Sequence, residues 1–157
     1  MIYLVLLWLH VIGAAILLGT GVGIAFFMVM AHRSGDPASI AHVAGTVVIA
    51  DFLFTASAIA AQPITGALLM IEQGWPLSTP WIAVALGLYL VTGAFWLPVV
   101  FMQIRMRDLA RTAAAKGDPL PSAYHRLYRL WFAFGFPAFF AVLGIVWLMV
   151  TKPDLAL

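Results

Sequence analysis

Four long apolar segments, separated by short polar breaks, dominate the pattern of hydrophobic and polar positions along this chain. The first, residues 2–31, contains no Asp, Glu, Lys or Arg and a single histidine, His10. The other three cover residues 42–71, 80–103 and 124–151. A helix needs about 20 apolar residues to cross the hydrocarbon core of a bilayer. The pattern therefore predicts an all-α fold class: a polytopic membrane four-helix bundle that forms one domain over residues 1–157.

The polar breaks contain residues that end one helix and begin the next. Gly35 suits the position that follows a helix, and Asp36 with Pro37 suits an N-cap and the first helical residue. Thr79 and Pro80 likewise suit an N-cap and a first helical residue, at the start of the third span. These breaks are therefore expected to be turns between consecutive helices.

The second span is the most polar of the four. One face of this helix is expected to carry residues that recur at steps of four, three, four and three. They are Asp51, Thr55, Ala58, Gln62 and Thr65. Because polar groups are costly against lipid, we expect this stripe to face the bundle interior. Pro63, in the same span, cannot donate a hydrogen bond to the carbonyl of Ile59, which frees that acceptor.

The composition indicates that lipid is the solvent for most of the surface. Of 157 residues, 64% are hydrophobic and 9% are charged, whereas a soluble domain has about 25% charged residues. The mean hydropathy is +1.06. There is no cysteine, which excludes disulfides, iron–sulfur clusters and thiolate metal sites.

The basic residues lie in two of the three breaks. Arg33 lies between the first two spans, and a larger basic group lies between the third and fourth. This group is Arg105, Arg107, Arg111, Lys116, Arg126 and Arg129. The positive-inside rule then predicts a long basic cytoplasmic connection between helices 3 and 4, with both termini outside (N-out/C-out). The arginines are expected to contact anionic lipid headgroups, and no nucleic-acid partner is expected.

His10 is the first candidate for chemistry, because it lies roughly 12 Å from the end of an apolar helix at 1.5 Å per residue. Gln62 and Tyr89 are expected at a similar depth. A neutral imidazole is a good ligand for iron, copper and zinc, and a bundle interior is a usual place for a haem. A hydrogen bond from His10 to Gln62 or Tyr89 would explain the histidine equally well, and both interpretations stay open.

Asp51 is the second candidate, as a proton or cation site within the membrane. An ion pair is favoured over that role, because Asp51 is expected near the basic end of the bundle. The candidate partners are Arg33, Arg105 and Arg129. A weaker hypothesis is a zinc site at the same end, formed by His32, His42, His125, Asp36 and Asp118.

Several short motifs resemble known membrane families. The segment Leu9-His10-Val11-Ile12-Gly13, followed by Gly19, is similar to the first helix of the HemJ and CopD-like proteins. The segment Pro63-Ile64-Thr65-Gly66-Ala67-Leu68-Leu69 resembles their second helix, and Lys152-Pro153 resembles their ending. Over its whole length the chain is similar to a bacterial family of predicted integral membrane proteins, through residues 35–37, 103–109 and 147–150.

The HemJ resemblance implies a four-helix haem b protein that oxidises protoporphyrinogen, with His10 as an axial iron ligand. The chain departs from HemJ at one position: HemJ has an essential lysine in its third helix, and residues 81–102 contain no Lys or Arg. The second axial ligand would be Met70, a water molecule or His10 of a second protomer.

Two hypotheses follow. In the first, the chain is a b-type haem-binding protein of the bacterial inner membrane with an electron-transfer or oxidoreductase role, and Gln62 and Tyr89 lie beside the haem held by His10. The redox partner is open, and the glycine-rich first helix is compatible with a homo-oligomer. In the second, the chain is a cofactor-free transporter, channel or structural subunit that uses the Asp51-Thr55-Gln62-Thr65 stripe.

Overall fold

The computed structural model, which describes residues 1–155, is all-helical over its described length. Its elements are α1 (Ile2–Ser34), α2 (Pro37–Ala50), the π-helical segment η1 (Asp51–Thr55), α3 (Ala56–Gln73), α4 (Pro80–Lys116) and α5 (Ser122–Thr151). α2, η1 and α3 follow one another without a break, so these elements make four helices long and apolar enough to cross a membrane. The predicted four-helix membrane architecture is confirmed at this level.

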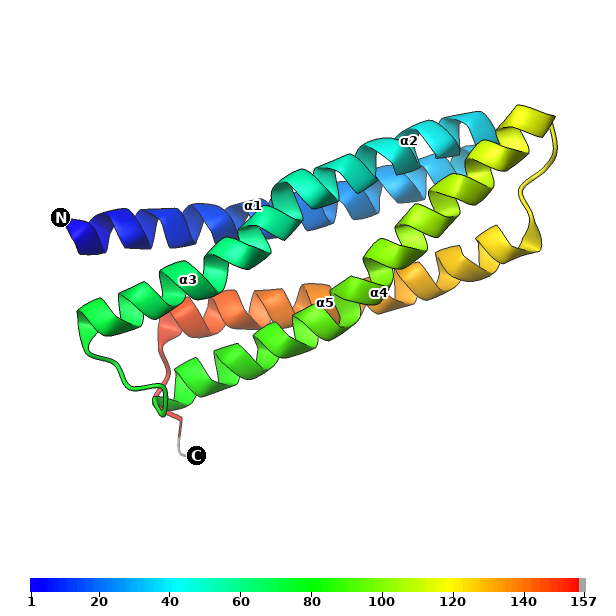
Figure 1. Ribbon diagram of the computed structural model, residues 1–157. Coiled ribbons are helices and arrows are strands. Elements are labelled where there is room, and N and C mark those ends of the chain that lie inside the picture. The colour runs from blue at the N-terminus through cyan, green and yellow to red at the C-terminus, as the bar shows by residue number, and fades with distance from the viewer. Residues whose placement is uncertain (156–157) are drawn as a thin grey trace.

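The helices alternate in direction (Figure 1). Both chain ends and the α3–α4 connection lie toward one end of the bundle, and the α1–α2 and α4–α5 connections lie toward the other. α4 packs along α5, α1 packs against α2 and α3, and α2 packs against α4. The α2–α4 contact joins the two halves of the chain at the end that carries the basic residues.

The first polar break folds as its residues predict. Gly35 has φ +68°, a left-handed conformation in which glycine has no steric penalty. The Asp36 carboxylate accepts hydrogen bonds from the backbone N–H groups of Ala38 at 3.3 Å and Ser39 at 2.8 Å. Pro37 occupies the first turn, where its missing N–H costs nothing.

The helices extend beyond the predicted spans, and Gln103 shows why this matters. The third predicted span ends at Gln103, which is only 1% exposed. α4 runs on to Lys116, and this glutamine lies on its inward side, next to Asp51 and Trp131. Gln103 is buried although a basic segment follows it, because Arg105 and Arg111 lie on exposed faces of the same helix.

The π-helical turn η1 was not predicted from the sequence. Here the N–H of Ala56 donates to the carbonyl of Asp51, five residues back, in place of the usual four. Single π-turns are rare and are frequent at functional sites. Asp51 and Thr55, at the two ends of this segment, are both buried.

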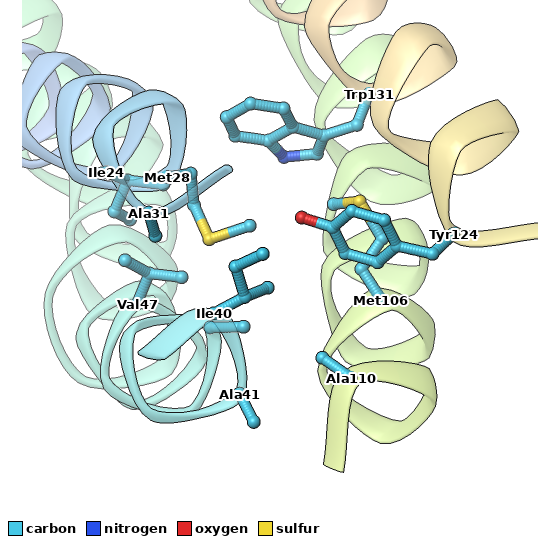
Figure 2. Packing of buried hydrophobic residues seen from close by; sticks show 11 residues of the cluster. Ile24, Met28, Ala31, Ile40, Ala41, Val47, Met106, Ala110, Tyr124 and Trp131 are labelled. Atoms are coloured by element: carbon cyan, nitrogen blue, oxygen red, sulfur yellow. The ribbon is translucent and has the colours of Figure 1, made fainter. Parts of the chain in front are cut away.

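A buried cluster at the basic end of the bundle joins α1, α2, α4 and α5. Figure 2 shows Met28 and Ile40 pointing across the gap toward Met106 and Tyr124. All four side chains are completely buried. The outer surface is apolar in contrast, with Trp8 62% exposed, as expected for helices surrounded by lipid.

Candidate functional site

His10 lies on the side of α1 that packs against α3. Its Nδ1 is 2.8 Å from the hydroxyl oxygen of Thr65, which is in turn 2.9 Å from the carbonyl of Ala61. When the Thr65 hydroxyl donates to the carbonyl of Ala61, its oxygen accepts from the ring, and the ring proton is then on Nδ1 of His10. Nε2 then carries a free lone pair, and no residue in 1–155 forms a hydrogen bond with it.

Gln62 contacts His10 through the backbone and not through the imidazole ring. Its Nε2 donates to the carbonyl of His10 at 2.8 Å. Gly13 makes this close contact between α1 and α3 feasible, whereas a side chain at Gly66 would make only an ordinary contact. A Cβ at Gly13 would collide with the Gln62 amide nitrogen, and a Cβ at Gly66 would lie 3.4 Å from Cε1 of His10. The structure therefore brings His10 and Gln62 together.

Tyr89 lies elsewhere. Its hydroxyl donates to the carbonyl of Ile59 at 2.8 Å. This carbonyl is the acceptor that Pro63 was expected to free, and Tyr89 satisfies it from the neighbouring helix α4. The His10 ring therefore forms no hydrogen bond with the side chain of Gln62 or of Tyr89. Within residues 1–155 its hydrogen-bond partner is Thr65.

The donor set around His10 fits one axial position of a haem iron. A ligating histidine usually donates its second ring N–H to a protein acceptor, which fixes the tautomer and the ring orientation. Thr65 is such an acceptor here. Met70, the protein side chain suggested as the second ligand, packs instead into an apolar cluster around Trp81 and Leu148.

Asp51 is 3% exposed and is held by two neutral N–H donors from α4. The indole nitrogen of Trp96 donates to Oδ1 at 3.2 Å. The Gln103 amide is oriented so that both its nitrogen and its oxygen have partners. In this orientation Nε2 of Gln103 donates to Oδ2 of Asp51 at 2.8 Å. The Gln103 oxygen then accepts from the indole nitrogen of Trp131 at 3.3 Å. The carboxylate is thus anchored to α4 directly and to α5 through Gln103.

The expected ion pair at Asp51 is wrong. Within residues 1–155 the structure has one salt bridge, between Arg107 and Asp108 at 2.9 Å. Arg33, Arg105 and Arg129 are exposed, whereas Asp51 faces inward. The carboxylate points into the bundle, toward Trp96 of α4. The arginines lie at the basic end of the bundle, away from it.

A cavity of about 510 Å³ adjoins Asp51. Residues of α1, η1, α3, α4 and α5 line it, and most of the lining is apolar or aromatic. The polar lining residues are Asp51, Thr55, Thr92, Trp96, Gln103 and Trp131. The hydroxyl oxygen of Thr55 is buried and has no hydrogen-bond partner. His10, Gln62 and Tyr89 are not among the lining residues, so the chain has two separate polar sites.

The histidines at the basic end do not form a zinc site. Residues 1–155 contain no group of three metal-ligating side chains. His32 stacks on the ring of Tyr128, with 3.6 Å between ring centroids, and its Nδ1 is 3.4 Å from the Tyr124 hydroxyl. His125 lies edge-on to His32 at 5.8 Å. Aromatic packing explains the two histidines, and the zinc hypothesis is wrong.

The chain matches the family described as "Predicted integral membrane protein (DUF2269)" over residues 4–153. The chain belongs to this family. No curated protein and no solved structure matches it. The family description agrees with the four apolar helices of the structure.

In this DUF2269 chain, sequence reasoning found the two polar centres but missed most of their partners. Thr65 was placed on the inward stripe, and its position one turn from Gln62 was the available signal. Gln103 and Trp131 were not linked to Asp51, because residues on three different helices show no shared spacing in the sequence. The inward orientation of the stripe itself is confirmed, since Asp51, Thr55, Ala58 and Thr65 are buried.

Proposed function

We propose that the chain is a b-type haem-binding protein with an electron-transfer or oxidoreductase role, in which Nε2 of His10 is an axial ligand. The observation that carries this proposal is the 2.8 Å contact between Nδ1 of His10 and Thr65. In the tautomer in which Nδ1 donates to Thr65, Nε2 is the unprotonated nitrogen that iron requires. When bound, the haem would supply the redox chemistry.

The chain's own residues orient the imidazole. Thr65 fixes the ring by accepting the Nδ1 proton, and Gln62 ties α3 to the backbone of His10. A second iron ligand would come from a water molecule or from His10 of a second copy.

The proposed location is the bacterial inner membrane, with both termini outside. The two connections at the basic end, α1–α2 and α4–α5, contain or adjoin most of the arginines, which favours the cytoplasm for that end. Arg105, Arg111, Arg126 and Arg129 are exposed and available to anionic headgroups. His10 would then lie in the outer half of the membrane.

The test is an absorption spectrum of protein expressed with added haem and purified in mild detergent, before and after dithionite. We expect a Soret band and a reduced α-band that disappear in His10→Ala. The matched control is His42→Ala, an exposed histidine whose loss should leave the spectrum unchanged. Thr65→Val should lower haem affinity by about 10–100-fold, as removal of a ligand's hydrogen-bond partner does. A wild-type protein without these bands, or an unchanged His10→Ala spectrum, contradicts the proposal.

The second candidate function is a cofactor-free transporter or channel, favoured by the cavity that Asp51 and Thr55 line. Only half of the predicted stripe serves this cavity, because Gln62 and Thr65 hold His10 instead. The two candidates differ in their sensitive residue. Transport would survive His10→Ala and be lost in Asp51→Asn, whereas haem binding would show the reverse.

A further inference from the structure

We infer that the central cavity is a binding site for a protonated amine with a compact apolar body, and that Asp51 is its counter-ion. The inference concerns the cavity alone. It rests neither on haem at His10 nor on movement of the ligand across the membrane. Three features of the lining lead to it. The carboxylate of Asp51 has no basic residue beside it, the hydroxyl of Thr55 is buried, and the rest of the lining is mostly apolar.

Both oxygens of the Asp51 carboxyl group are placed to accept hydrogen bonds. Each of its oxygens faces an N–H donor, from Trp96 on one side and Gln103 on the other. Hydrogen bonds donated to a carboxylate favour its charged form. No Lys, Arg or His belongs to the described cavity lining. A buried charge without a partner is costly, so a cation in the cavity would stabilise this arrangement.

Thr55 adds a second recognition group. Its hydroxyl oxygen is buried and forms no hydrogen bond of standard geometry within residues 1–155, although it lies close enough to Asp51 to interact with the carboxylate; the residue is 6% exposed. It lies four residues after Asp51 in η1 and lines the same cavity. An ammonium group has several N–H donors, so it would bond to the carboxylate and to this hydroxyl together.

The remaining lining suits the apolar body of such a ligand. The cavity volume of about 510 Å³ lies within the usual range for small-molecule sites, which are mostly apolar with a few polar groups. Trp131, Phe132 and Phe136 line it, and aromatic faces attract cations. A divalent metal ion fits less well, because it takes about six oxygen ligands and the cavity offers one carboxylate.

The experiment compares two probes of similar shape, 1-adamantylammonium chloride and neutral 1-adamantanol. Each is titrated calorimetrically at neutral pH into the full-length protein in mild detergent. We expect the amine to bind at least about tenfold more tightly than the alcohol, as a charge-assisted hydrogen bond in a dry site allows. Asp51→Asn should reduce the amine affinity to that of the alcohol. The matched control is Asp108→Asn, whose carboxylate pairs with Arg107 outside the cavity.

Equal wild-type affinities for amine and alcohol, or an unchanged amine affinity in Asp51→Asn, would overturn the inference. Should Asp51→Asn fail to purify as a single species, Thr55→Val carries the test. This variant keeps the carboxylate, and it should weaken amine binding and leave alcohol binding unchanged. The same titration with His10→Ala should give the wild-type result, which separates this inference from the haem proposal.

Discussion

The hydroxyl of Tyr89 donates to the carbonyl of Ile59, the acceptor that Pro63 leaves free in the neighbouring helix. The bond joins α4 to α3 and satisfies this backbone oxygen. Prolines inside membrane helices are tolerated where a neighbouring group supplies the missing donor. In this chain the donor comes from a side chain 30 residues further along the sequence.

Tyr89→Phe should therefore lower the free energy of unfolding by about 1–3 kcal/mol, the cost of leaving a buried acceptor unpaired. The measurement is equilibrium unfolding in mixed micelles with increasing SDS. Pro63→Ala restores an N–H group for Ile59, so the same Tyr89→Phe change should cost much less in that background. Equal costs in the two backgrounds would show that Tyr89 stabilises the fold by another route.

Gly13→Ala should disturb the contact between α1 and α3. The added methyl group would displace the Gln62 amide and break its hydrogen bond to the carbonyl of His10, a loss of about 0.5–1.5 kcal/mol. Gly21→Ala is the control, because a Cβ there meets no atom within 4 Å. Thermal unfolding followed by circular dichroism should show a lower midpoint for Gly13→Ala only. If both variants unfold at the same temperature, Gly13 is not needed for close helix packing.

Gln103→Leu should destabilise the protein through Asp51. The change removes the donor to Oδ2 of Asp51 and the acceptor for the Trp131 indole, so we expect a loss of about 1–3 kcal/mol or more. Asp51→Asn in the Gln103→Leu background should recover part of this loss, because the buried group is then neutral. Gln73→Leu, at an exposed position, serves as the control in the same SDS titration. A cost no larger than that of Gln73→Leu would contradict the proposed network.

The helices could be predicted from the sequence because their determinants are local. Apolar length indicates a membrane span, and the turn at Gly35 and Asp36 follows from the conformational freedom of glycine and the capping ability of a short carboxylate. Pro63 likewise frees a carbonyl wherever it stands in a helix, so the need for a donor was predictable although Tyr89 was not identified as that donor.

The surroundings of Asp51 depend on the packing of distant helices and were not predicted. Its donors lie 45 or more residues away, on α4, and a second indole reaches it through Gln103 from α5. Because a basic segment follows Gln103, its sequence context is that of a residue at the membrane surface. Only the rotation of α4 in the bundle turns it inward, and the π-helical turn at Asp51 has no recognised sequence pattern.

The absence of cysteine allows a direct test of the proposed orientation. Single cysteines at Ser34 and Ser122 would lie at the basic end, and one at Ser78 would lie in the α3–α4 connection at the opposite end; all three positions are exposed. In intact cells, a membrane-impermeant maleimide should label Ser78→Cys alone. Labelling of Ser34→Cys and Ser122→Cys should require permeabilised cells, because the positive-inside rule places their arginine-rich connections in the cytoplasm. The reverse labelling pattern would show that the protein has the opposite orientation, with His10 in the inner half of the membrane. The cysteine-free wild type reports background labelling, and unchanged helix content by circular dichroism shows that each variant folds.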